Sequence, residues 1–461
     1  MERTNTVNIG DTVDGSRVGG FQVGIFALCA ACLILDGFDV QIMGVVNPEI
    51  RGEFGLDAAQ LGYATTAGLI GILVGALLFS MLGDRFGRRP VLIIATLYFS
   101  VVTLATGFVG SLWPLVALRF LGGIGLGGIM PNLVALVGEY SPKRSRAFIT
   151  MLVQNGFNIG AMLVGFTALY VIPEYGWRMM FYIGGVVPIV IGLAMLVYLP
   201  ESLQFLALRN ARDGRLAKWL TRVDPSVVIT PETTLVAREK PAPGVPVTQL
   251  FKSGRAVGTS LLWSANFMNL LLLYFLAQWL PLVFRDAGMS QTNAIWVATT
   301  LQGGGVIGTM VLGWLISKFG YVRTLATSFG IGCIAVAIMG QSASLAVLFT
   351  IVFVAGFCVV GGQGGLNSLA ANYYPTQVRS TGIGSALGVG RLGVIVGQPI
   401  AAGLLGRGLT PAALLFVAAL PGVITSVSLY ALRKRVRSQG GNAAEPEPEA
   451  EAAPATASLG H

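Results

Sequence analysis

The sequence predicts an all-α membrane protein whose twelve spanning helices form two similar six-helix halves. Only 11% of the 461 residues are charged and 54% are apolar, whereas soluble domains contain about 25% charged residues. Twelve apolar runs have the length of about 20 residues that a spanning helix needs. Several motifs also recur at one fixed offset along the chain. The runs are residues 21–46, 60–82, 91–110, 113–138, 147–171, 178–199, 257–284, 290–317, 322–341, 344–369, 378–405 and 410–432.

This composition excludes a soluble enzyme, a disordered chain and a disulfide-stapled secreted domain. The net charge of +9 does not indicate a nucleic-acid partner, because the charges lie between apolar runs. The only histidine is His461, so we expect no histidine-ligated metal within the spans, and we expect no cofactor. The glycines between residues 123 and 128 follow no strand, so they indicate close helix contact rather than a nucleotide loop, and the chain is not expected to use ATP.

The positive charges predict the orientation in the membrane. Twenty-four Lys and Arg residues lie on the side of both termini, and four lie on the other side, which places both termini in the cytoplasm. The expected organisation is a cytoplasmic N-terminus, a six-helix half, a cytoplasmic central loop, a second six-helix half and a disordered cytoplasmic tail. These parts are residues 1–20, 21–199, 200–256, 257–437 and 438–461.

The two halves repeat at one constant offset along the chain. Residues 139–142 (EYSP) match residues 372–375 (NYYP), and Pro48 matches Pro281 at the same offset. A duplicated six-helix unit is typical of transporters whose binding site lies near the membrane midplane, between the halves.

Residues 83–90 (GDRFGRRP), between the second and third spans, resemble the signature loop of the major facilitator superfamily. An acidic residue at a helix end can cap a neighbouring helix and pair with arginine, which predicts a cytoplasmic gating latch; the alternative is positive-inside anchoring alone. Glu139 lies about 20 residues, roughly 30 Å, from Arg119, so we expect it to join the latch through Arg146 or the loop of Asp84. The predicted latch residues are Gly83, Asp84, Arg85, Gly87, Arg88, Arg89, Glu139 and Arg146.

Two further motifs resemble the aromatic acid:proton symporter family. They are residues 36–39 (DGFD) in the first span and residues 388–393 (GVGRLG) in the eleventh; residues 199–202 (LPES) and 139–142 also fit the family. The resemblance covers the chain up to about residue 438. It implies proton-coupled import of an aromatic carboxylic acid.

Four ionisable residues lie deep inside the predicted spans: Asp36, Asp39, Arg119 and Arg391. Because such a residue costs several kcal/mol (about 2.5–3.5 on insertion scales), it is expected to face a cavity or a partner. Asp36 and Asp39 share a helix face, and the helical rise of about 1.5 Å per residue places all four in the middle and outer half of the membrane. They can therefore line one cavity; the alternative is two internal salt bridges without a role in binding.

Each charge is assigned a role from its chemistry. The planar guanidinium of Arg391 suits a substrate carboxylate. Asp36 or Asp39 would carry the proton, because desolvation and a like neighbour favour the neutral form of a carboxyl group, and Arg119 would set the charge of that site.

Other polar and aromatic residues in the spans are candidate substrate contacts. The alternatives are hydrogen bonds between helices for the polar residues and packing for the aromatic ones. The polar candidates are Gln154, Asn155, Asn158, Asn266, Asn269, Gln302, Gln363 and Asn367, and the aromatic candidates are Phe38, Tyr63, Tyr274 and Trp279.

The sequence therefore predicts a multi-pass transporter of the bacterial inner membrane, not an enzyme. Its expected partners are a small aromatic carboxylate such as a hydroxybenzoate, protons and the lipid bilayer. A symporter, exchanger or efflux antiporter of another organic anion is the alternative, followed by a non-transporting membrane sensor. A sensor would usually carry a soluble signalling domain, which this sequence does not indicate.

Overall fold

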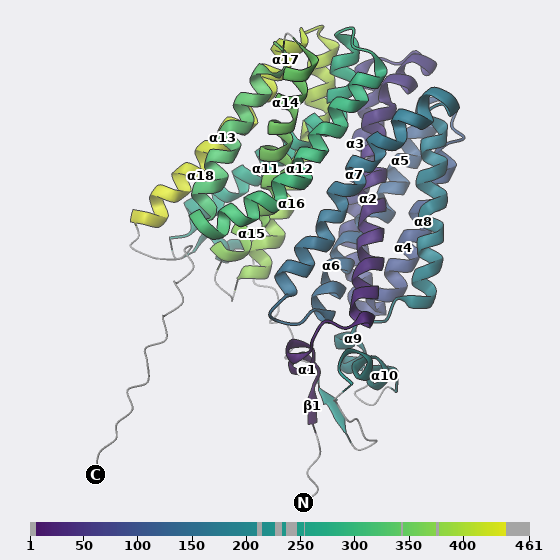
Figure 1. Ribbon diagram of the computed structural model, residues 1–461, viewed down its shortest axis with the longest axis vertical. Coiled ribbons are helices and arrows are strands. Elements are labelled where there is room, and N and C mark those ends of the chain that lie inside the picture. The colour runs from purple at the N-terminus through teal and green to yellow at the C-terminus, as the bar shows by residue number, and fades with distance from the viewer. Residues whose placement is uncertain are drawn as a thin grey trace, which may run out of the picture.

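A computed structural model shows a bundle of helices in two groups that lie side by side (Figure 1). It describes residues 6–209, 214–225, 233–236, 247–252, 254–342, 344–374 and 378–438; the predicted disordered tail lies almost wholly outside them. Twelve helices in the described part are long and apolar enough to cross a membrane. The predicted all-α membrane fold is confirmed.

The first half begins where the chain enters the bundle, and its helices run from purple to teal in Figure 1. They are α2 (Gly20–Phe54), α3 (Ala58–Phe86), α4 (Arg88–Thr106), α5 (Leu112–Gly127), α6 (Ile129–Tyr140), α7 (Arg146–Tyr175) and α8 (Arg178–Tyr198). Together α5 and α6 make the fourth span.

The second half repeats this arrangement. It comprises α11 (Ala256–Asp286), α12 (Gln291–Phe319), α13 (Tyr321–Met339), α14 (Leu345–Ala355), the π-helix η2 (Gly356–Val360), α15 (Gly361–Tyr373), α16 (Arg379–Gly406), α17 (Pro411–Ala418) and α18 (Leu420–Ser438). The offset found in the sequence relates Ala58, where α3 begins, to Gln291, where α12 begins. It also relates Arg88, where α4 begins, to Tyr321, where α13 begins. The helix bounds thus follow the internal repeat.

The first helix is longer than predicted. The apolar run ends at residue 46, but α2 continues through Pro48 to Phe54. Its last turns carry charged residues that hydropathy excludes from a span, and those residues are held by ion pairs: Arg51 with Asp286 at 2.8 Å and Glu53 with Arg178 at 2.7 Å. The helix therefore extends beyond the end of its apolar stretch.

Small elements cover one end of the first half. They are β1 (Thr6–Asn8), α1 (Ile9–Gly15), α9 (Leu203–Arg209), α10 (Gly214–Val223) and β2 (Thr234–Val236). The 3-10 turn η1 (Val247–Phe251) instead contacts α11 and α16 of the second half. The strands pair in parallel, with Val7 opposite Leu235, and Trp219 of α10 stacks on Phe21 with ring centroids 5.5 Å apart. Sequence analysis predicted no structure in these segments. We call this end, where α2 and α11 begin, the chain-end face and the opposite end the far face.

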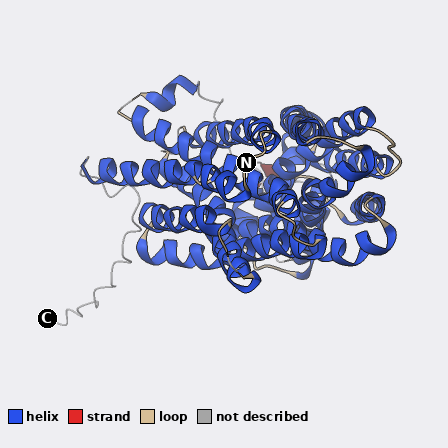
Figure 2. Ribbon diagram, turned by 90° about the horizontal axis from the view of Figure 1, so that it is seen from above, coloured by secondary structure: helices blue, strands red, loops and turns tan. Residues whose placement is uncertain are grey.

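The two halves meet along three helix pairs, α2 with α11, α3 with α16 and α7 with α12; Figure 2 shows the close-packed helices from above. Among the described residues, the hydrogen bonds and ion pairs found between the halves join α2 to α11. They are Gln278 to the Val40 carbonyl at 2.7 Å, Gln278 to Gln41 at 3.3 Å, and Arg51 to Asp286 at 2.8 Å. The ion pair ties the halves together at the far face.

Within each half, glycines set how closely the helices approach. On α3, a Cβ at Gly75 would lie 1.9 Å from the Ile124 carbonyl oxygen, and one at Gly71 would lie 2.2 Å from the Phe120 carbonyl oxygen. Helices α3 and α5 therefore touch backbone to backbone, as small residues permit in membranes. The predicted role of the glycines at 123–128 in helix contact agrees with this, because Gly123 and Gly127 face α3 in the same way.

We expect Gly75→Ala to lower the free energy of unfolding by about 1–3 kcal/mol, because the added methyl group overpacks the α3–α5 contact. The measurement is the midpoint of thermal unfolding in detergent. Gly403→Ala is the matched control, since a Cβ there meets nothing within 4 Å. Equal midpoints for both variants and the wild type would contradict this packing.

Candidate functional site

A cavity lies between the two halves and holds about 520 Å³ of empty space, part of it open to solvent. One wall comes from α2, α3, α5, α6 and α7, and the other comes from α11 and α16. The lining residues are Asp36, Val40, Leu69, Ile72, Leu126, Gly127, Met130, Phe157, Tyr274, Arg391, Val394 and Ile395. Its position between the halves is the one that the internal repeat predicts.

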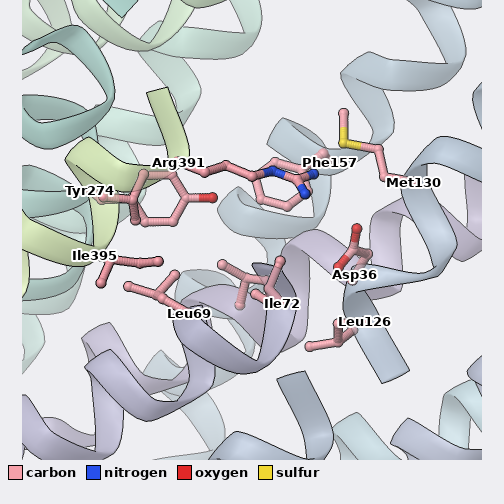
Figure 3. Close-up of a pocket in the computed structure, with 12 residues that line it drawn as sticks. Asp36, Leu69, Ile72, Leu126, Met130, Phe157, Tyr274, Arg391 and Ile395 are labelled. Atoms are coloured by element: carbon pink, nitrogen blue, oxygen red, sulfur yellow. The ribbon is translucent and has the colours of Figure 1, made fainter. Parts of the chain in front are cut away.

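Asp36 and Arg391 face this cavity from opposite halves (Figure 3). Asp36 is 5% exposed and Arg391 is half-buried. Among the described residues neither has a hydrogen bond or an ion pair within 4 Å, although the two charges interact electrostatically across the cavity. A cation and a carboxyl group without partners are costly inside a membrane, so both are available to a ligand or a proton.

Close helix contacts place these two side chains. A Cβ at Gly37 would lie 2.0 Å from the Phe157 carbonyl oxygen, so α2 and α7 touch beside Asp36, and Asp36 and Phe157 share one wall. On the other side, a Cβ at Gly393 would lie 2.3 Å from the Phe267 carbonyl oxygen. Glycine beside Arg391 thus allows α16 to pack closely against α11.

A second cavity, with about 360 Å³ of empty space, contains Asp39 and Arg119. The two side chains form an ion pair at 3.3 Å, and Thr103 donates a hydrogen bond of 2.7 Å to Asp39. The Arg119 guanidinium also lies 5.0 Å from the ring centre of Phe181, a favourable cation–π contact. Both members of this ion pair belong to the first half.

The four charges thus lie in two adjoining cavities, and whether they act as one site stays a prediction. The two cavities adjoin and share Val40, Leu69, Ile72 and Leu126, but each holds one acid and one arginine. The reason is that Asp36 and Asp39, although on one helix face, are displaced by about 4.5 Å along the axis. Of the two salt bridges in the alternative, the structure contains that of Asp39 with Arg119, and its role in binding stays a prediction.

Gln278 of α11 reaches the second cavity from the other half. Its amide donates to the backbone carbonyl of Val40, one residue after Asp39, at 2.7 Å. The sequence patterns predicted neither Gln278 nor Phe157 as a site residue. The one available signal for Phe157 was its position beside Asn158, the repeat counterpart of Arg391.

The other predicted substrate contacts lie elsewhere among the described residues. Asn269 and Gln363 share a hydrogen bond of 2.7 Å, and Gln363 also donates to Asn367 at 3.0 Å. Trp279 is fully buried and donates to Gln398 at 2.8 Å. The substrate role stays a prediction for the residues that line neither cavity: Phe38, Tyr63, Gln154, Asn155, Asn158, Asn266, Asn269, Trp279, Gln302, Gln363 and Asn367.

At the chain-end face, the acidic member of the predicted latch is Glu139 rather than Asp84. Arg88 forms an ion pair with Glu139 at 2.6 Å, and Ser202 donates to the same carboxylate at 2.5 Å. Asp84 and Arg85 are exposed, and Asp84 forms no ion pair with any described residue. At the solvent-facing end of α3 the Asp84 carboxylate stays hydrated, whereas Glu139 is buried and needs a cation.

A second acid, Glu201, caps α4. Its carboxylate accepts hydrogen bonds from the backbone N–H groups of Arg88 at 2.9 Å and Arg89 at 3.1 Å, as a helix N-terminus favours. Gly87 has a φ of +98°, and a Cβ there would lie 2.4 Å from Glu201. The sequence indicated Glu201 only as part of the motif at residues 199–202, without a capping role.

Two further latch residues contact other elements of the first half. Arg146 pairs with Asp14 of α1 rather than with Glu139, and it donates to the Ser141 carbonyl at 3.0 Å. Gly83 lies against Asn132, whose side-chain oxygen would be 2.2 Å from an added Cβ. Whether this network gates transport stays a prediction.

Comparison with known proteins identifies the family. A sequence model of the Major Facilitator Superfamily matches residues 29–283 and 262–459. The chain belongs to the major facilitator superfamily. It is therefore a multi-pass protein of the bacterial inner membrane and not an enzyme, as the sequence predicted.

The relatives in this superfamily agree with the predicted resemblance to aromatic acid transporters. The chain is 36% identical to a 4-hydroxybenzoate transporter of Pseudomonas putida, over 92% of this chain and 95% of the relative. It is 34% identical to a gallate transporter of Pseudomonas putida, over the same shares. Among solved structures, the xylose transporter of E. coli in a partially occluded inward-open conformation matches with a TM-score of 0.69 and 16% identity, covering 90% of this chain and 98% of that one. This last similarity concerns the fold alone.

We expect Asp39→Ala to lower the free energy of unfolding by about 3–5 kcal/mol, because Arg119 is then left buried without its partner. Asp36→Ala is the matched comparison: it removes a carboxyl group of the same helix that has no ion pair, so the loss is smaller. Thermal unfolding of both purified variants measures the difference. An equal or larger loss for Asp36→Ala would contradict the assignment of the paired and unpaired acids.

Proposed function

We propose that this protein imports a small aromatic monocarboxylate together with protons by alternating access. In this proposal the chain-end face is cytoplasmic, as the distribution of Lys and Arg favours. The single observation that carries it is the unpaired Arg391 in a cavity between the halves, opposite the unpaired Asp36. The names of the relatives, 4-hydroxybenzoate and gallate transporters, support the substrate class.

Arg391 binds the substrate carboxylate in the proposed mechanism. Its guanidinium offers a planar fork of donors that suits a carboxylate in bidentate geometry, and among the described residues no acid lies within 4 Å to compete. The aromatic ring of the substrate then lies among Phe157, Leu69, Ile72 and Met130, which are apolar lining residues. Aromatic and aliphatic walls with a few polar groups are typical of small-molecule sites.

Asp36 carries the proton. Since Asp39 is already compensated by Arg119, Asp36 is the acid without an ion pair in this region of the described chain. With substrate bound, the carboxylate neutralises Arg391 and leaves the charge of Asp36 uncompensated in a closed cavity. Proton binding removes that charge and lets the loaded cavity close.

Alternating access then requires the contacts between the halves to break and re-form. The hydrogen bonds of Gln278 and the ion pair of Arg51 with Asp286 hold the far face together, so we assign the structure to the state closed on that face. The Arg88–Glu139 pair and the Glu201 cap lie at the opposite face. All of these groups belong to the first half, and we propose that they keep its cytoplasmic end together as one unit when the halves rock.

The test is uptake into proteoliposomes with an imposed inward-directed proton gradient. The panel comprises benzoate, hydroxybenzoates, phenylpropionates and aliphatic acids. We expect accumulation of the benzoates, driven by the gradient, and no accumulation of the aliphatic acids. Failure of every aromatic acid to enter would reject the proposed substrate class, and binding without flux would favour a receptor.

We expect Asp36→Asn to abolish proton-driven accumulation while leaving exchange of labelled for unlabelled substrate, because the variant cannot bind or release the coupled proton. Asp57→Asn is the matched control: this exposed residue caps α3, and asparagine caps as well as aspartate. Accumulation in Asp36→Asn at the wild-type ratio would overturn the role of Asp36.

A further inference from the structure

Tyr274 of α11 lies in the first cavity together with Arg391 and Asp36. Figure 3 shows its hydroxyl group directed into the space in front of Arg391, away from the α11 backbone. Asp36 lines the same cavity from the other half. Tyr274 thus belongs to the same polar cluster as the two charges.

The hydroxyl group of Tyr274 has no hydrogen bond to any described residue. A tyrosine hydroxyl that is removed from bulk water usually finds a partner, as Tyr140 does with the Glu201 carbonyl at 2.7 Å and Tyr182 does with the Gly107 carbonyl at 3.1 Å. The apolar lining residues around Tyr274 offer it none. Its donor is therefore free for a ligand in the cavity.

Tyr274 and Arg391 belong to one rigid wall. Helices α11 and α16 touch at Gly393 against Phe267, and at Gly397, where an added Cβ would lie 3.0 Å from the Leu271 side chain. Asp36, in contrast, lies on the other half. Two donors on one wall, without an acid within 4 Å among the described residues, form a site for one carboxylate.

We infer that Tyr274 is a substrate-binding residue whose hydroxyl group donates a hydrogen bond to the substrate carboxylate held by Arg391. The inference rests on the proposed function and deepens it: the carboxylate is bound by the second half alone, and the first half supplies the proton site and the ring contacts. In this inference the hydroxyl group contacts the carboxylate, which benzoate and 4-hydroxybenzoate share. Its removal therefore weakens the binding of both acids equally.

The test compares Tyr274→Phe with wild type in proteoliposome uptake. A hydrogen bond to a charged group corresponds to a change of roughly 10- to 100-fold in binding, so we expect KM to rise by this factor for both benzoate and 4-hydroxybenzoate. The maximal rate and the thermal unfolding midpoint should stay at the wild-type values. Tyr170→Phe is the matched control, because Tyr170 is 76% exposed on α7 and lies in neither cavity.

Each alternative outcome has its own meaning. An unchanged KM overturns the inference, and so does a rise confined to 4-hydroxybenzoate, because the hydroxyl would then contact the ring substituent. A lower unfolding midpoint with a lower maximal rate and an unchanged KM overturns it in favour of a structural role.

Failure of the proposed function is distinguishable from failure of this inference. If wild type takes up an aliphatic monocarboxylate instead of the aromatic acids, the substrate class is wrong, but the ratio of KM values for Tyr274→Phe and wild type with that acid still tests the hydrogen bond. Direct binding of radiolabelled benzoate to the purified proteins provides the second measurement. Equal dissociation constants for Tyr274→Phe and wild type would overturn the role of Tyr274.

Discussion

The cost of a charge inside a membrane without a partner is the constraint on which this structure depends. Asp39 and Arg119 meet it by pairing at 3.3 Å within the first half, supported by Thr103 and the ring of Phe181. Asp36 and Arg391 do not pair, because they belong to different halves and face each other across a cavity. In the proposed mechanism their charges are balanced only when a substrate or a proton binds, and this requirement links the substrate, the proton and the closing of the cavity.

Glycines let the helices within each half pack closely. Backbone-to-backbone contacts hold α2 against α7, α3 against α5, and α11 against α16. The halves also approach closely, since a Cβ at Gly44 would lie 2.6 Å from the Ala277 carbonyl oxygen. Polar contacts join α2 to α11 as well, among them the hydrogen bond of Gln278 to Val40. Rigid units with a separable seam are the arrangement that rocking-type alternating access requires.

The internal duplication also shows where the two halves differ. The counterpart of Asp36 is Asn269, and the counterpart of Arg391 is Asn158, and neither asparagine lines the described cavities. An acid remains in one half and a cation in the other. The asymmetry divides the chemistry between them, since the first half holds the proton site and the second half holds the anion site in the proposed mechanism.

The sequence by itself determined the spans, the repeat and the four charges inside the spans, because hydropathy, offset and helix periodicity are local properties of the chain. It did not determine the chain-end elements around α10, the extension of α2 to Phe54, or the capping of α4 by Glu201. It did predict that Glu139 joins the loop of Asp84, where Arg88 pairs with it. Only the tertiary structure decided that Asp39 is paired while Asp36 is not, and that Phe157 and Tyr274 complete the cavity. These features depend on contacts between helices far apart in the chain, which no local pattern records.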